Sequence, residues 1–261
     1  MDRWDDREKA WDDEEKAWDD QEKALELNNA GVDFFEQEKF GEALACFNAS
    51  ILLNPEDGVG WGHKGTSLHY LEKYGDAIKC FDEAIRLDPQ HNGAWYNKGT
   101  VLLELENYED SLTCFNKSIM INSNCSNCWH NKGVLFEELE EYEEAIVYYD
   151  EAIKLNPEDS AAWNNKGIAL NALGKYKEAI VCFDEAIKVN PEKFYAWINK
   201  GATLDFPLER HEEAIACYDE VIQLNPKYPG GWNDKGIVLE KLGRDEEAKQ
   251  CFAKVKELQQ S

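Results

Sequence analysis

The hexapeptide AWNNKG at residues 162–167 returns along the chain in close copies. Its variants AWYNKG, CWHNKG and AWINKG begin at residues 94, 128 and 196, and looser versions begin at 26, 60 and 231. The closing glycine therefore recurs every 34 residues, with a last step of 35: Gly31, Gly65, Gly99, Gly133, Gly167, Gly201 and Gly236. A fixed period of about 20–50 residues is typical of repeat architectures, so one repeated unit determines the fold.

One full repeat, residues 160–193, reads SAAWNNKGIALNALGKYKEAIVCFDEAIKVNPEK. Apolar residues recur at helical spacing on both sides of Gly174 and Lys175, which predicts two short helices joined by a tight turn. Pro191 ends the second helix, because proline disfavours the α conformation in the residue before it. In the sixth repeat there is one extra residue, and Pro207 is expected to end the first helix early.

The repeated glycine lies inside the first helix, where it costs about 1 kcal/mol relative to alanine. A small residue follows twelve or thirteen positions later on the second helix: Ala43, Ala77, Ser111, Ala145, Ala179, Ala214 and Ala248. Two small residues allow the helices to pack closely. The tryptophan four residues before the glycine, and an aromatic residue about sixteen after it, are expected to fill the space around this contact. Neither helix buries its apolar face alone, so the repeats must stack.

This pattern resembles the tetratricopeptide repeat (TPR) family. The matching residues of one repeat are Trp163, Gly167, Leu170, Ala179, Phe183, Ala186 and Pro191. Seven repeats are expected at 24–57, 58–91, 92–125, 126–159, 160–193, 194–228 and 229–261, after a leader at 1–23. The resemblance implies an all-α, right-handed superhelical solenoid with a concave groove lined by the first helices. The wording NKG…CFDEAIKVNP is also similar to long arrays found in methanogenic archaea.

The composition of the chain limits the kinds of partner that it can bind and the compartments in which it is expected. The chain of 261 residues has a net charge of −25, which repels nucleic-acid backbones, and no basic stripe compensates. No apolar stretch approaches the roughly 20 residues of a membrane span. Six cysteines recur once per repeat, too far apart to form disulfides, and are expected to be buried apolar fillers: Cys46, Cys80, Cys114, Cys182, Cys217 and Cys251. The expected location is the reducing cytoplasm.

The other polar motifs do not form a catalytic constellation. Cys125 and Cys128 make a single Cys-x-x-Cys, whereas a zinc site usually has four ligands, and no βαβ pattern surrounds the motif. The histidines have no nucleophile around them, and no glycine-rich phosphate loop is present. We therefore expect no enzyme activity, no metal and no cofactor, and the role of Cys125 and Cys128 stays open.

The candidate binding site is the concave face of the first helices. On a helical wheel of the first helix, with the tryptophan at 0° and about 100° per residue, several positions cluster on the side that faces away from the helix-pair core. The residue two before the glycine lies next to this cluster. It forms a ladder, mostly of amides: Asn29, His63, Asn97, Asn131, Asn165, Asn199 and Asp234. Neighbouring groove positions hold Tyr96, His130, Asn164, Thr100, Val134 and Ile168.

An amide both donates and accepts hydrogen bonds, which suits a peptide backbone. The resemblance implies that these asparagines touch ligand, as they do in family members that bind extended peptides. The alternative is that they only hydrate the groove. This face lacks the lysines and arginines with which chaperone-binding members hold a C-terminal carboxylate. The expected partner is thus a protein or peptide segment that is neutral, apolar or basic, rather than an acidic tail.

The leader at residues 4–24 consists of three nearly identical heptads, WDDREKA, WDDEEKA and WDDQEKA. Acid-to-lysine pairs four residues apart favour a helix. Arg7, Glu14 and Gln21 occupy the positions that an ordinary coiled coil would make apolar. In a helix continuous with the first repeat, a stripe of Trp4, Trp11 and Trp18 faces away from the core of that repeat. This stripe is a candidate docking site, and the alternative is a solvated extension or a tandem duplication.

The sequence as a whole predicts a non-catalytic interaction scaffold. The alternative is a self-assembling module that uses the tryptophan leader together with the last helix. That helix carries Phe252, Val255 and Leu258 and is followed by no capping helix in this sequence.

Overall fold

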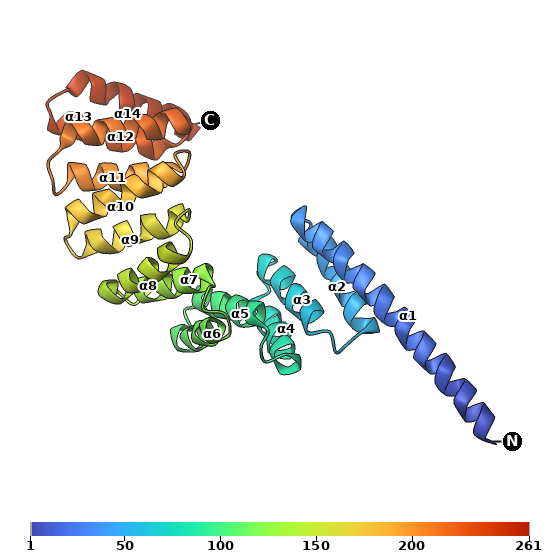
Figure 1. Cartoon of the computed structure of the whole chain (residues 1–261). Coiled ribbons are helices and arrows are strands. Elements are labelled where there is room, and N and C mark those ends of the chain that lie inside the picture. Colours follow the sequence, from blue (N-terminus) through green and yellow to red (C-terminus); the bar gives the residue numbers. More distant parts are fainter. Residues whose placement is uncertain (1, 261) are drawn as a thin grey trace. The chain divides into compact units, whose positions relative to one another are not determined.

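The computed structural model describes the backbone of residues 2–260 and the side chains of residues 16–259. Between residues 2 and 260 it contains fourteen α-helices and no strand, which form seven successive helix–turn–helix repeats (Figure 1). The predicted all-α solenoid fold is therefore confirmed.

The helices follow the predicted alternation of first and second helix. They are α1 (Asp2–Glu36), α2 (Phe40–Leu53), α3 (Gly58–Tyr70), α4 (Tyr74–Leu87), α5 (Asn92–Glu104), α6 (Tyr108–Ile121), α7 (Ser126–Glu138), α8 (Tyr142–Leu155), α9 (Ser160–Ala172), α10 (Tyr176–Val189), α11 (Phe194–Asp205), α12 (His211–Leu224), α13 (Pro229–Lys241) and α14 (Asp245–Gln260). As expected, α11 ends two residues before Pro207.

The helices form two compact units. The N-terminal unit, Met1–Ser123, holds α1 to α6, and the C-terminal unit, Asn124–Ser261, holds α7 to α14. Within each unit the two helices of a repeat pack together, and the second helix also packs against the first helix of the next repeat. The apolar core is thus continuous along each unit, as stacked repeats require.

The repeated glycine is explained by the aromatic ring on the second helix. A Cβ atom at Gly167 would lie 2.5 Å from a ring carbon of Phe183, and one at Gly65 would lie 2.6 Å from the ring of Phe81. The same ring covers the glycine in every repeat, and Phe183 is fully buried. Glycine is therefore required by the close approach of a ring.

The tryptophans pack against the core clusters, as expected, and also make a hydrogen bond that the sequence did not predict. Trp163 is only partly buried, and its indole Nε1 donates to the carbonyl oxygen of Pro157 at 3.1 Å. The equivalent bond recurs in four other repeats, at Trp61, Trp95, Trp197 and Trp232. The indole thus ties the first helix to the loop before it, while the phenylalanine or tyrosine lies on the glycine.

An ion pair links consecutive repeats. Lys166 Nζ lies 2.5 Å from Asp150 Oδ1 on the preceding second helix. Three further pairs repeat this geometry: Lys98 with Asp82, Lys200 with Asp184 and Lys235 with Asp219. The lysine stem lies along the core, as its position before the glycine suggests, and the ammonium group meets a carboxylate of the adjacent repeat.

The leader is continuous with the first helix of the first repeat, because α1 runs unbroken from Asp2 to Glu36. The side chain of Trp18 is 76% exposed, whereas Ala24 is buried and its carbonyl oxygen accepts a hydrogen bond from Ser50 Oγ at 2.7 Å. The side chains of Trp4 and Trp11 lie outside the described residues.

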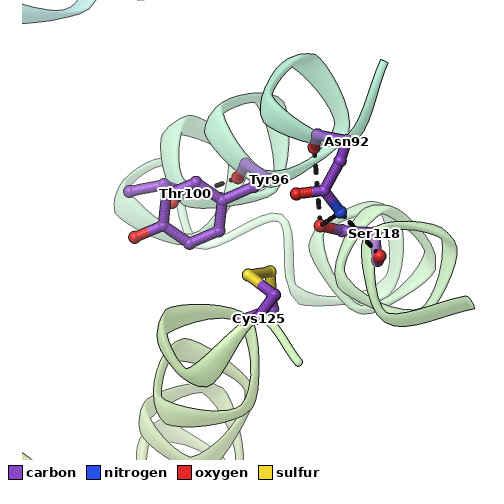
Figure 2. The surroundings of a disulfide bond; sticks show 6 residues. Asn92, Tyr96, Thr100, Ser118 and Cys125 are labelled. Carbon is purple, nitrogen blue, oxygen red and sulfur yellow. Dashed lines mark hydrogen bonds between the residues drawn. A yellow bond between two sulfur atoms is a disulfide. The ribbon is translucent and has the colours of Figure 1, made fainter. Parts of the chain in front are cut away.

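The cysteines divide into two groups. The six repeat cysteines are free thiols, and all except Cys46 are fully buried, in agreement with their expected role as fillers. Cys125 and Cys128 form a disulfide, which the sequence reasoning did not predict (Figure 2). Because disulfides are rare in the cytosol, this pair does not fit the expected reducing environment. The cytoplasmic location stays a prediction.

Candidate functional site

In the N-terminal unit, the predicted groove residues are half-buried and contact the neighbouring repeat. His63 Nδ1 lies 3.1 Å from Asn28 Oδ1, and Asn97 Nδ2 donates to Thr66 Oγ1 at 3.0 Å. Burial lowers the pKa of His63 below its ordinary value, which favours the neutral imidazole. Asn29, the expected first member of the ladder, is exposed, and its buried neighbour Asn28 is the residue that contacts His63.

Tyr96 and Thr100 lie one helical turn apart on α5 and are both half-buried. The hydroxyl of Thr100 donates to the carbonyl oxygen of Tyr96 at 3.2 Å (Figure 2). A cavity of about 330 Å³ lies nearby, lined by residues of α1 and α3 and by Asn97 and Phe47. Of the predicted groove residues of this unit, His63 and Asn97 therefore line a hollow.

In the C-terminal unit, hydrogen bonds join amides and a histidine of successive first helices. Asn165 Nδ2 lies 3.3 Å from His130 Nε2, and His130 Nδ1 lies 3.0 Å from Asp159 Oδ2. Asn199 Nδ2 donates to Asn164 Oδ1 at 2.9 Å. Asn164 Nδ2 also donates to Asn165 Oδ1 at 3.2 Å, so the amides of successive first helices form a connected network.

The apolar groove positions also contact the core. Val134 and Ile168 are half-buried and pack against the core clusters of their own unit. Asn131 is also half-buried on α7.

A buried acid lies behind the ladder in the fourth repeat. Tyr149 takes the place of phenylalanine over Gly133, and its hydroxyl donates to Glu137 Oε2 at 2.6 Å. Burial raises the pKa of Glu137 and that of Tyr149. The hydroxyl provides the hydrogen bond that this desolvated carboxyl group needs.

A cavity of about 300 Å³ lies between the starts of α9 and α11. Its lining combines the amides of Asn164 and Asn165 with the rings of Phe194 and Tyr195 and with small residues such as Ala161. Tyr195 is 62% exposed. The sequence analysis missed these two aromatic residues, although Tyr195 falls at about 160° on the same helical wheel, inside the groove sector.

A second cavity, of about 360 Å³, opens between α11 and α13. It is lined by Ala202, Asp205, Phe206, Tyr218, Asp234 and Ile237. Burial raises the pKa of Asp234 above its ordinary value. The aspartate occupies the ladder position that holds asparagine in five other repeats.

A third hollow, of about 490 Å³, lies beside the leader in the N-terminal unit. Trp18 and Leu25 on α1 border it, together with Asn54 and Asp57 from the loop that follows α2. Leu25 is 60% exposed.

The described part of the chain was expected to contain neither a metal site nor a membrane span. Among the residues that the structure describes, no group of three or more histidine, cysteine and acidic side chains could hold a metal ion. In that same part of the chain, no helix combines the length and the apolar character needed to cross a bilayer.

The fold defines an all-helical repeat protein built from helix–turn–helix units. Tetratricopeptide repeat models match residues 63–121, 126–159, 160–193 and 230–261, and a TPR repeat model matches 206–243. These matches together cover more than half of the chain. The chain therefore belongs to the tetratricopeptide repeat family, whose members are generally non-catalytic scaffolds for protein interactions.

Solved structures include several with the same fold. YrrB, described as a TPR protein with an unusual peptide-binding site, has a TM-score of 0.56 at 25% identity, over 70% of this chain and 93% of YrrB. A TPR protein from Parabacteroides merdae has a TM-score of 0.67 at 18% identity, over 91% of this chain and 93% of its own. PilF from Pseudomonas aeruginosa has a TM-score of 0.71 at 13% identity, over 79% of this chain and 94% of its own. Comparison with curated proteins gives no match.

Proposed function

We propose that the chain binds a peptide or protein segment on the groove formed by its first helices, centred on the cavity between α9 and α11. The observation that carries this proposal is the lining of that cavity. Asn164 and Asn165 offer hydrogen bonds to a peptide backbone, and Phe194 and Tyr195 border an apolar slot of about 300 Å³. A few convergent polar groups beside apolar walls are typical of a ligand site.

The peptide-binding site of YrrB supports a ligand of this class, because YrrB shares the fold at 25% identity. The charge of −25 favours a segment that is neutral, apolar or basic over an acidic one. The ladder hydrogen bonds hold the first helices in place, which reduces the cost of ordering the site when a ligand binds. The function is recognition, without catalysis.

A random peptide display library selected on the full chain tests this proposal. Selected peptides should bind Tyr195→Ala at least about tenfold more weakly than the wild type, because aromatic residues dominate such interfaces. Val181→Ala is the matched control, since Val181 is an exposed apolar residue of α10 outside the groove. Equal binding to wild type and Tyr195→Ala would contradict the proposal.

Self-association is the second candidate function. Trp18 and Leu25 are exposed beside the hollow of about 490 Å³, and a tryptophan on a helix is a strong anchor for another chain. Light scattering on the full chain should then give a mass that rises with concentration, and Trp18→Ala should remove the rise. A monomeric mass at all concentrations would exclude this function.

A further inference from the structure

The cavity between α11 and α13 has one unpaired charge in its lining. Asp234 is half-buried, and among the described residues only Asn233 donates a hydrogen bond to its side chain, from Nδ2 at 3.2 Å. None of the ion pairs among the described residues includes Asp234. A carboxylate accepts hydrogen bonds and donates none, so it differs in kind from the asparagines of the other repeats.

The second carboxylate of the cavity already has two side-chain partners. Asp205 lies at the end of α11, where Oδ1 is 2.8 Å from His211 Nδ1 and Oδ2 pairs with Lys241. Burial raises the pKa of Tyr218, with the charges of Asp234 and Asp205 adding to the effect, so the phenol stays neutral. The lining therefore contains an uncompensated negative charge at Asp234.

Apolar surface surrounds this charge. Phe206 is 76% exposed at the rim of the cavity, and Ile237 is 40% exposed beside Asp234 on α13. Ala202 contributes a small side chain to the lining. An aromatic face attracts a cation within about 6 Å, and aliphatic walls suit the methylene stem of a long basic side chain.

We propose that the cavity lined by Asp234, Phe206 and Ile237 binds a lysine or arginine side chain of the peptide that occupies the groove. The cation pairs with Asp234 and lies near the ring of Phe206, and its stem packs on Ile237 and Ala202. A neutral apolar side chain would leave the half-buried carboxylate without a partner, and an anion would be repelled by it. The inference rests on the proposed function and specifies part of its ligand.

The groove positions support this assignment. Asp205 and Ala202 are the fourth and first residues after Gly201, and Ile237 is the first after Gly236. These are the positions that the helical wheel places on the concave face. The cavity at Asp234 and the apolar cavity beside Tyr195 thus belong to the same face of the C-terminal unit, on successive repeats.

The peptides selected on the full chain also test this inference. They should carry lysine or arginine at one fixed position, and Asp234→Asn should weaken their binding at least about tenfold. Replacing that lysine or arginine of the peptide by norleucine should weaken binding to the wild type by the same factor. It should hardly change binding to Asp234→Asn, since the two replacements remove one and the same interaction. Asparagine occupies this ladder position in five repeats, so the variant is expected to fold, which its thermal melting curve verifies.

Glu246→Gln is the matched control, because it removes one exposed carboxylate of α14 outside the cavity. An equal loss of binding in Asp234→Asn and Glu246→Gln would indicate general charge attraction and overturn the inference. Peptides that require Tyr195 but bind Asp234→Asn as tightly as the wild type would overturn the proposed cation-binding site at Asp234. The groove proposal would stand. If no peptide is selected, or if binding ignores Tyr195, the groove proposal and this inference are both wrong.

Discussion

Repeats five and six are neighbours in the C-terminal unit and share the same buried scaffold. In both, a glycine of the first helix lies under an aromatic ring of the second, Gly167 under Phe183 and Gly201 under Tyr218. Both also carry a lysine before that glycine, paired with an aspartate of the preceding repeat. The buried positions are therefore alike.

The two repeats differ where a ligand would lie. Repeat five begins with Ser160 and Ala161, whereas repeat six begins with Phe194 and Tyr195. Repeat six also has an extra residue and exposes Phe206 at the end of α11. The shared residues determine the fold, and the departures from the repeat line two of the cavities, so recognition depends on what is not repeated.

The largest expected effect is the loss of the ring that covers the glycine. Phe183→Ala should lower the free energy of unfolding of the neighbouring repeats by about 3–5 kcal/mol, because a fully buried aromatic side chain is removed. Trp163→Ala should cost roughly half as much, since the indole is only partly buried. Denaturation followed by circular dichroism measures both variants. Equal losses would mean that the partly buried tryptophan contributes as much to the core as the ring on the glycine.

The next largest loss of stability is expected when the glycine under the ring is replaced by alanine in each of the two repeats. Gly167→Ala should destabilise by about 1–2 kcal/mol, because overpacking against Phe183 exceeds the gain in helix propensity. Gly201→Ala should cost less, since its nearest ring carbon would be 3.0 Å from the new Cβ, against 2.5 Å at Gly167. Hydrogen exchange of the amides in α9 and α11 localises each loss. A greater loss at Gly201 would contradict this ranking.

These two comparisons show what the sequence could predict. The period, the helix pairs and the end of α11 before Pro207 follow from repeated apolar spacing and proline chemistry. Which aromatic ring covers Gly167 could not be predicted, because both Trp163 and Phe183 lie at suitable spacing. The choice depends on how the paired helices rotate about their axes. Tertiary packing makes that choice.

The site was less predictable than the fold. The ladder of Asn97, Asn165 and Asn199 was found because it repeats, but its bonds between repeats depend on the stacking distance of the helices. Tyr195 and Phe206 each occur once in the array, so no periodicity marks them. The position of Asp234 was found with the ladder, but the aspartate itself occurs there only once. The helical wheel could have found Tyr195, whereas the cavity around Asp234 requires three helices in place.

A smaller effect concerns the turn before the second helix. Gly174 of repeat five has φ 73°, whereas Glu209 holds the matching place of repeat six at φ 53°. L-residues are strained in this left-handed region, and glycine is not. Glu209→Gly should therefore stabilise the chain by about 1 kcal/mol or less, and Gly174→Glu should destabilise it by a similar amount. Thermal melting of the two variants checks the sign, and a loss of stability in Glu209→Gly would contradict it.

The smallest effect is expected at the lysine that both repeats share. Lys166 and Lys200 each lie within 2.6 Å of an aspartate on the preceding repeat, and the lysine side chains are 19% and 21% exposed. The aspartates are about half exposed, so solvent screens the pairs, and Lys166→Met should cost only about 0.5 kcal/mol while keeping most of the buried stem. Lys200→Met should behave alike, because the two pairs have the same geometry. High salt should reduce the difference between wild type and each variant. A loss well above 1 kcal/mol that survives high salt would show that the ion pair between repeats contributes as much to stability as the ring on the glycine.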